Sequence, residues 1–231
     1  MKKIIFLLLS CIVIQNSIHA MQRTKQALTP SDLLIKDIEN NNIEGVEELL
    51  RIKDFNVNQP DSHGHIPLHI AIAQDKVEIA KLLLKHGANP NQQDATNKDR
   101  SPLHIAASNG NENLVRLLLT HLANVNLQDN AGNSPLYYAV VFNKPEIIQL
   151  LLHNKANAIL KNKRGETAIS AAIALKNDGI RQMIENHILR QEQTTAILRG
   201  FMQEESRTHE QSPLNLLPRD KEILKDILSK I

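Results

Sequence analysis

Cysteine and aromatic residues are scarce in this chain. Its 231 residues include one cysteine, two tyrosines, four phenylalanines and no tryptophan. A single cysteine cannot form an internal disulfide, and it cannot supply a zinc site built from several thiolates. The fold must therefore be stabilised by the packing of aliphatic side chains.

An excess of one charge is also lacking. The chain has 27 Lys and Arg against 25 Asp and Glu, and two of the basic residues, Lys2 and Lys3, lie at the N-terminus. Without those two, the charges balance. A neutral chain with few aromatic residues offers neither the field nor the stacking surfaces that nucleic acids need. We expect no nucleic-acid partner.

Catalytic signatures are absent from the sequence. There is no Gly-x-Ser-x-Gly elbow, no phosphate-binding loop and no His-Glu-x-x-His zinc helix. The eight glycines are scattered and form no phosphate-cradling cluster. The chain is predicted to be no enzyme and to use no cofactor.

The N-terminal segment has the pattern of a secretory signal peptide. Lys2 and Lys3 precede an apolar run over residues 4–14, and Ala20 offers a small residue for cleavage. The run is too short to span a bilayer as a helix. We predict a signal peptide at 1–20, a linker at 21–30, and a mature chain without a membrane span in the periplasm or beyond. The alternatives are an apolar first helix of a cytosolic protein and lipid attachment at Cys11.

A four-residue phrase returns along the chain at a fixed period. It begins at Ile66, Ser101, Ser134 and Thr167 and reads Ile-Pro-Leu-His, Ser-Pro-Leu-His, Ser-Pro-Leu-Tyr and Thr-Ala-Ile-Ser. The second residues are 35, 33 and 33 positions apart. Such a period is typical of stacked supersecondary units, which mostly bind partners.

Each phrase is predicted to begin a short helix. Ser101 and Ser134 are good N-cap residues, and the proline that follows fits the first helical position. An alanine recurs at positions 71, 106, 139 and 172, and leucine triplets recur at 82–84, 117–119 and 150–152. Small residues permit close stacking of the first helices, and the leucines supply buried area in the second.

These residues resemble the ankyrin repeat family over about residues 31–187. The resemblance implies an all-α solenoid, in which a short β-hairpin finger precedes two antiparallel helices in each unit. It also implies a structural hydrogen-bonding role for His69 and His104. The predicted units are a degenerate N-terminal cap at 31–60 and repeats at 61–93, 94–128, 129–161 and 162–187, followed by a helical tail at 188–231.

Two departures from the repeat are informative. Gly87 ends one second helix, but Leu122 and Lys155 stand at the equivalent positions. If these two residues are left-handed, each costs about 1 kcal/mol; alternatively, the turn differs locally. An insertion in residues 94–100 lengthens one finger, as either a contact device or tolerated loop variation.

In the tail, apolar residues at 223, 224, 227, 228 and 231 fall on one face of a short predicted helix after Pro218. The helix either caps the last repeat or is offered to a partner.

Asp61, His63 and His65 form the one candidate cluster of metal ligands. Alternate residues of an extended finger face the same side, which favours a shared ion. The alternative, which the sequence favours, is an exposed turn of variable polar residues. The sequence therefore assigns no metal site.

The resemblance implies a protein partner that meets the finger tips and the inner face of the first helices. Tyr138, Val141 and Phe142 stand out there because exposed aromatic residues suit an interface, unless they pack between repeats or beneath the tail. We expect a monomer that binds an unidentified protein. The predicted binding residues are Ser62, His63, His65, Thr96, Asn97, Lys98, Asn130, Asn133, Tyr138, Val141, Phe142, Lys163, Arg164 and Leu175.

Overall fold

The computed structural model of the chain describes residues 28–191. They belong to two compact units that meet in the sequence between Asn89 and Pro90. The predicted signal peptide, most of the linker, and the tail beyond residue 191 lie outside the described residues. Within the described range the elements are helical, as predicted.

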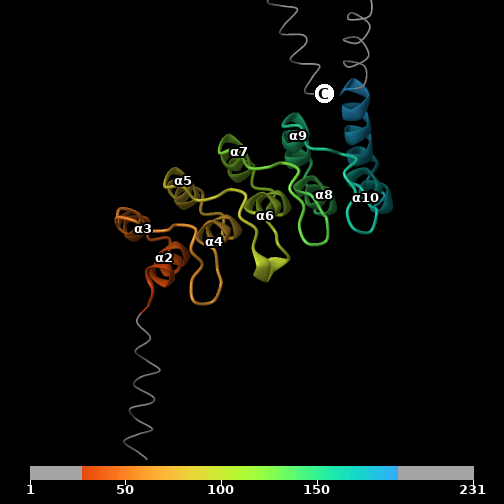
Figure 1. The fold of residues 1–231 in the computed structure, drawn as a ribbon. Helices are drawn as coiled ribbons and strands as arrows, with labels where there is room; N and C mark the ends of the chain where they lie inside the picture. Colours follow the sequence, from red (N-terminus) through yellow and green to blue (C-terminus); the bar gives the residue numbers. More distant parts are fainter. Residues whose placement is uncertain (1–27, 192–231) are drawn as a thin grey trace, which may run out of the picture. The chain divides into compact units, whose positions relative to one another are not determined.

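Unit one contains two helix pairs (Figure 1). The first pair is α2 (Pro30–Glu39) with α3 (Ile43–Leu50), and the second is α4 (Pro67–Ala73) with α5 (Val77–Lys85). Helix α2 packs on α4 and α3 packs on α5, so that first helices stack on first helices and second on second.

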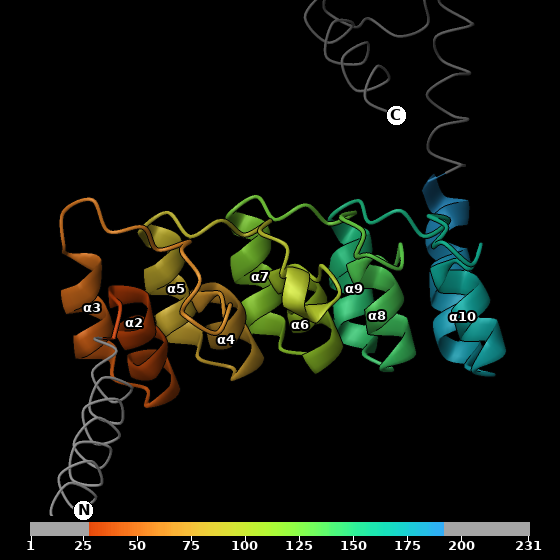
Figure 2. The same cartoon turned by 60° about the horizontal axis from the view of Figure 1, so that its bottom comes forward.

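Unit two repeats the same arrangement (Figure 2). A 3-10 turn, η1 (Ala95–Asn97), is followed by α6 (Pro102–Asn109), α7 (Glu112–Thr120), α8 (Pro135–Val141), α9 (Pro145–His153) and α10 (Ala168–Ala174). Helix α8 packs between α6 and α10, and α7 packs on α9. A last helix begins at residue 178 and continues through residue 191, across the boundary predicted between 187 and 188.

The helices begin where the sequence predicts. Pro67, Pro102 and Pro135 are the first residues of α4, α6 and α8, and Ser101 and Ser134 are the N-caps. The missing proline N–H costs nothing at that position, because the first turn has no intrahelical acceptor. The recurring phrase is therefore a set of helix starts.

The cores also follow the repeat. The four recurring alanines, Ala71, Ala106, Ala139 and Ala172, are fully buried in the first helices. Leucine and isoleucine side chains fill the space between the two helix layers of each unit. The largest of them are Leu34, Ile38, Leu68, Ile72, Ile79 and Leu83 in unit one, and Leu103, Leu114, Leu118, Leu136, Ile147 and Ile148 in unit two.

Each finger is a tight turn held by the side chain of its first residue. In the finger before α8, Asp129 Oδ1 accepts the backbone N–H groups of Ala131 and Asn133 at 2.9 and 2.8 Å. Gly132 has a φ of +80°, and a Cβ there would lie 2.8 Å from the backbone nitrogen of Lys163. Asn162 makes the same pair of bonds in the next finger. A neutral amide can therefore replace the carboxylate.

The fingers differ from the predicted β-hairpins. Residues 28–191 contain no extended strand, and their one isolated bridge joins Asp94 to Arg100 in the lengthened finger. The short fingers close with a single bond between their ends, such as Asp129 N–H to the Asn133 carbonyl at 3.0 Å. Five residues that include a turn leave only one residue on each side to pair.

Successive fingers are joined through their second residues. In unit two the N–H of Asn130 donates to the Lys98 carbonyl, and the N–H of Lys163 donates to the Ala131 carbonyl, both at 3.0 Å. In unit one the equivalent N–H, on Ser62, donates to Asp32 Oδ1 at 2.9 Å. Asp32 lies in the first turn of α2, and its carboxylate replaces the carbonyl that a preceding finger would provide.

Asparagine side chains also join consecutive repeats, through bonds to the backbone that follows the second helix. Asn126 accepts the N–H of Asn157 at 2.7 Å and donates to the Lys155 carbonyl at 3.2 Å. Asn91, 35 residues before Asn126, and Asn58, 33 residues before Asn91, make the equivalent pairs of bonds. Because an amide both donates and accepts, one side chain satisfies two backbone groups of the next repeat.

Of the two alternatives for the turns after the second helices, the left-handed conformation is the one observed. Gly87 has a φ of +86°, and Leu122 and Lys155 have values of +63° and +65°. A residue with a Cβ is strained there, which makes these two positions sites of stored backbone strain.

Histidine 104 joins the start of α6 to the following finger. Its Nδ1 accepts the Ser101 backbone N–H at 3.1 Å, so Nε2 carries the hydrogen and donates to the Asn133 carbonyl at 3.0 Å. The side chain is fully buried. Burial disfavours the imidazolium and lowers the pKa of His104 to about 4. The structural role predicted for His104 is confirmed.

Replacing Leu122 with glycine should stabilise unit two. Leu122 is 84% exposed, so little buried area is lost while the left-handed strain is relieved. We expect a gain of about 0.5–1 kcal/mol in the free energy of unfolding, measured by urea denaturation. Leu122→Ala keeps the strain and is the control. Equal stability of the two variants would contradict this account.

Acidification should destabilise unit two through His104. Its pKa is lower in the folded state than the ordinary 6.5, so stability is complete above that value and is lost as the pH falls toward 4. At pH 5 the loss should be about 2 kcal/mol relative to pH 7. Urea denaturation of His104→Gln, which cannot titrate, should show a smaller loss between these pH values. An identical loss would refute the assignment.

Candidate functional site

The predicted binding residues fall in both units. Ser62, His63 and His65 lie in the finger of unit one, and the others lie in unit two. All except three are exposed: Asn97 and Tyr138 are partly buried and Asn133 is buried. The two groups of residues are best considered as separate candidate sites.

The main candidate surface is the exposed side of α8 at its C-terminal end. Val141 ends the helix and Phe142 is its C-cap, so the side chains of both project from the last turn. Phe142 is 51% exposed and Val141 is 39% exposed. Tyr138, one turn earlier, has its ring stacked on Phe142, with centroids 6.3 Å apart and planes at 9°. The two aromatic side chains therefore act as one platform.

Tyr138 also ties this platform to the interior. Its hydroxyl donates to Asp129 Oδ2 at 2.7 Å, and its ring meets His104 edge-on at 5.7 Å. Burial, together with the hydrogen bond to Asp129, raises the pKa of Tyr138, so the phenol stays protonated and donates. The guanidinium of Arg100 lies 5.8 Å from the ring centroid. The orientation of the platform is thus fixed before any partner binds.

Leucine 175 continues the apolar surface on the next repeat. It is the C-cap of α10, the position that Phe142 holds on α8, and it is 54% exposed. Ile173 is 57% exposed, whereas Val140, its equivalent on α8, is 1% exposed. Sequence reasoning missed Ile173. Its exposure could have been predicted from its position in the last repeat, because the repeat pattern provides no further first helix to cover it.

We call the set Tyr138, Val141, Phe142 and Leu175 the apolar face. Its members come from α8 and α10, which pack together, and they occupy related positions of two adjacent repeats. Aromatic and aliphatic groups on a rigid support have the character of interface hot spots. The face can bury apolar groups of a partner, and it offers no nucleophile or acid–base pair.

The finger tips beside this face are polar. Lys98 is left-handed, with a φ of +60°, and Arg100 contacts the Asn97 amide oxygen. Arg164 forms an ion pair with Glu166 at 2.8 Å, and Glu166 also accepts the Tyr137 hydroxyl at 2.8 Å. The remaining predicted tip residues, Thr96, Asn130 and Lys163, are exposed. These tips supply hydrogen-bonding groups and positive charge near the apolar face.

Asparagine 133 belongs to the interior of the fingers. Its amide oxygen accepts Asn162 Nδ2 at 2.9 Å, and its backbone carbonyl accepts His104. The residue is buried. Its position in the finger suggested a surface contact, but its bonds hold two fingers together, so we leave it out of the proposed surface.

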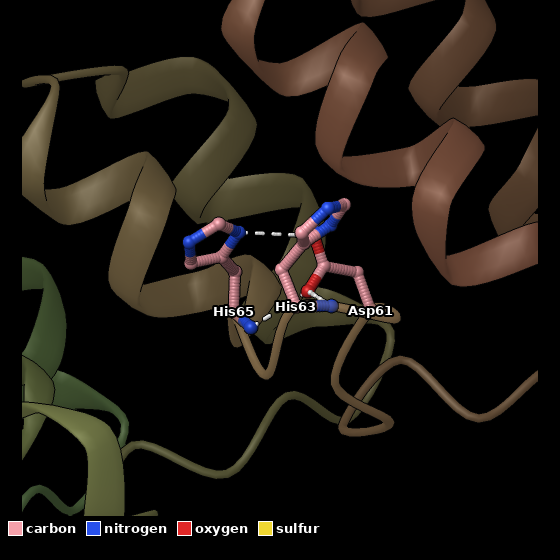
Figure 3. Close-up of side chains that lie close together, drawn as sticks. All are labelled: Asp61, His63 and His65. Carbon is pink, nitrogen blue, oxygen red and sulfur yellow. Dashed lines mark hydrogen bonds and ion pairs between the residues drawn. The ribbon is translucent and has the colours of Figure 1, made fainter.

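The second candidate site is the finger before α4, where Asp61, His63 and His65 converge (Figure 3). Asp61 Oδ2 lies 3.0 Å from His65 Nδ1 and 3.6 Å from His63 Nδ1. Burial raises the pKa of Asp61, but hydrogen bonds from His65 and His63 outweigh it and hold the pKa below its ordinary value. Each residue offers one ligand atom, and the three atoms lie within 4.8 Å of one another.

None of the helices described between residues 28 and 191 has the length and apolar character needed to cross a membrane. The predicted cleavage site at Ala20, Cys11 and the tail helix after Pro218 lie outside that range.

Known proteins match this chain through its repeats. A family model described as ankyrin repeats (3 copies) matches residues 3–94 and 92–162. The human 2-5A-dependent ribonuclease is 39% identical over 67 residues, which are 29% of this chain and 9% of that protein. Ankyrin repeat domain-containing protein 49 of Drosophila melanogaster is 38% identical over 58 residues, which are 25% of this chain and 27% of that protein.

Both matches cover a small part of the relative, so neither relative's name gives an activity to this chain. The family match covers more than half of the chain, and the helix pairs repeat in the same register. The protein therefore belongs to the ankyrin repeat family.

Proposed function

We propose that this protein is an exported, non-catalytic scaffold that binds a protein partner through the apolar face and the neighbouring finger tips of unit two. Ankyrin repeats imply a protein-interaction scaffold. The observation that supports this particular surface is Phe142, an aromatic side chain that is half exposed and stacked on an anchored Tyr138.

The polar finger tips near the apolar face favour an interface that combines apolar and charged contacts. The apolar face supplies area that gains free energy when it is removed from water. The finger tips supply Lys98, Lys163 and Arg164, which favour a partner with acidic groups around an apolar centre. The partner is a protein beyond the cell envelope, such as a host protein, or a bacterial protein held in the periplasm.

Partner capture should depend on Phe142. We expect Phe142→Asp to reduce the amount of captured partner at least tenfold, because the charge would be desolvated at the interface. The urea midpoint should change little, since a half-exposed side chain contributes little to folding. Leu122→Asp is a matched control, because it places the same charge at an exposed leucine outside the apolar face.

The outcomes are distinct. Loss of capture with Phe142→Asp and retention with Leu122→Asp supports the surface. Equal capture by all three proteins refutes it. Global unfolding of Phe142→Asp would place the side chain in the core and likewise refute the proposal.

Export should depend on residues 1–20. Fusion of the first 27 residues to a phosphatase that is active only outside the cytoplasm should give activity, and Leu8→Arg should abolish it by interrupting the apolar run. N-terminal sequencing of the exported chain should begin at Met21 if cleavage follows Ala20. A chain that retains Met1 and stays in the cytoplasm would contradict export, and release into the medium would distinguish secretion from periplasmic retention.

A further inference from the structure

We propose that Asp61, His63 and His65 bind one divalent transition-metal ion of the zinc class at the finger of unit one. The proposal is separate from the apolar face, because none of its ligands belongs to unit two. It starts from three donor atoms that the fold brings together on five residues of chain.

The separations suit a small ion. Zinc bonded to nitrogen and oxygen at about 2.0–2.1 Å in tetrahedral geometry holds its ligand atoms about 3.3 Å apart. The two imidazole nitrogens lie 3.0 and 3.6 Å from Asp61 Oδ2, on either side of this value. Small rotations of the two exposed rings would close the site around an ion (Figure 3).

The carboxylate is already held in place. Asp61 Oδ1 accepts the backbone N–H groups of His63 and His65 at 2.9 and 2.7 Å, and only 4% of the Asp61 side chain is exposed. These bonds fix one carboxylate oxygen and leave the other beside the imidazoles. A carboxylate that is already held through one oxygen loses little conformational freedom when its other oxygen binds an ion.

The finger itself is anchored to α2. The backbone N–H and the hydroxyl of Ser62 both donate to Asp32 Oδ1, at 2.9 and 2.7 Å. Ser62 Oγ lies 3.3 Å from His63 Nδ1. Because the Ser62 hydroxyl hydrogen is used by Asp32, Nδ1–H of His63 is the donor in this contact, and the imidazole releases that proton when it binds an ion.

In another finger, too, the side chains at the positions of His63 and His65 lie next to each other. The residues that correspond to His63 and His65 before α10 are Arg164 and Glu166, and their side chains form an ion pair at 2.8 Å. The backbone turn therefore places the third and fifth side chains of a finger next to each other. Only in unit one's finger are both of them imidazoles.

The donor set indicates the type of ion. Two imidazoles and one carboxylate favour zinc, copper, nickel or cobalt, whereas calcium and magnesium prefer oxygen ligands throughout. His63 and His65 are exposed, with 76% and 47% of their side chains accessible. The remaining coordination position thus faces solvent and would hold water.

The finger before α8 provides the design of a variant that tests the site. Asp129, Ala131 and Asn133 hold the corresponding positions before α8, where the same turn forms without histidine. The double variant His63→Ala/His65→Asn therefore copies an existing finger and should keep the fold. Asp61→Asn copies Asn162 and keeps the two bonds to the backbone.

Zinc titration of the full chain by calorimetry, after removal of bound metal, measures the site. We expect one equivalent to bind the parent chain, the double variant to lose that equivalent, and Asp61→Asn to weaken binding at least tenfold. The control variant His86→Ala/His153→Ala removes two exposed histidines from helix ends and should bind as the parent does.

A spectroscopic readout locates the ion. In amide NMR spectra of the full chain, paramagnetic nickel should broaden residues 61–66 first in the parent and not in the double variant. The absence of saturable binding by the parent, unchanged binding by the double variant, or broadening centred elsewhere would each overturn the proposal.

Discussion

The turn of each finger exposes backbone N–H groups that need acceptors close at hand. In this protein they are supplied by the first side chain of the finger, Asp61 in unit one and Asp129 or Asn162 in unit two, which accepts two N–H groups at once. Unsatisfied groups of this kind would oppose the burial of neighbouring side chains. The stacking of helix pairs within each unit and the direction of every finger side chain depend on these bonds.

In unit two the residue that holds the finger turn also orients the proposed binding surface. Asp129 uses one oxygen for its finger and the other for the Tyr138 hydroxyl, so the carboxylate that shapes the turn also fixes the ring that supports Phe142. An exposed aromatic side chain normally loses rotamer freedom when it binds. Here part of that loss has already occurred on folding, and the apolar face needs less reorganisation to receive a partner.

Much of the fold follows from the sequence because helix starts and small core residues have local causes. The prolines at the first helical positions and the recurring alanines could be placed from the repeat register, which also identified Leu122 as the position equivalent to Gly87. Asn133 and Ile173 could not be placed from that register alone. The burial of Asn133 depends on the neighbouring finger, through Asn162, and the exposure of Ile173 depends on the end of the repeat pattern. The metal-ligating potential of His63 and His65 was visible as spacing, but the separations from Asp61 required coordinates.

In unit one the side chain of Asp32 provides the acceptor that a finger backbone provides in unit two. In unit two a finger donates the N–H of its second residue to a peptide carbonyl of the preceding finger, which any residue provides, whereas the finger of unit one donates it to a particular carboxylate, that of Asp32. The repeats of unit two are thus interchangeable in this bonding, whereas the opening segment of unit one is not. A gene that gains or loses whole repeats of unit two by duplication or deletion would retain this bonding pattern, so the array can change length over evolution while its beginning stays fixed.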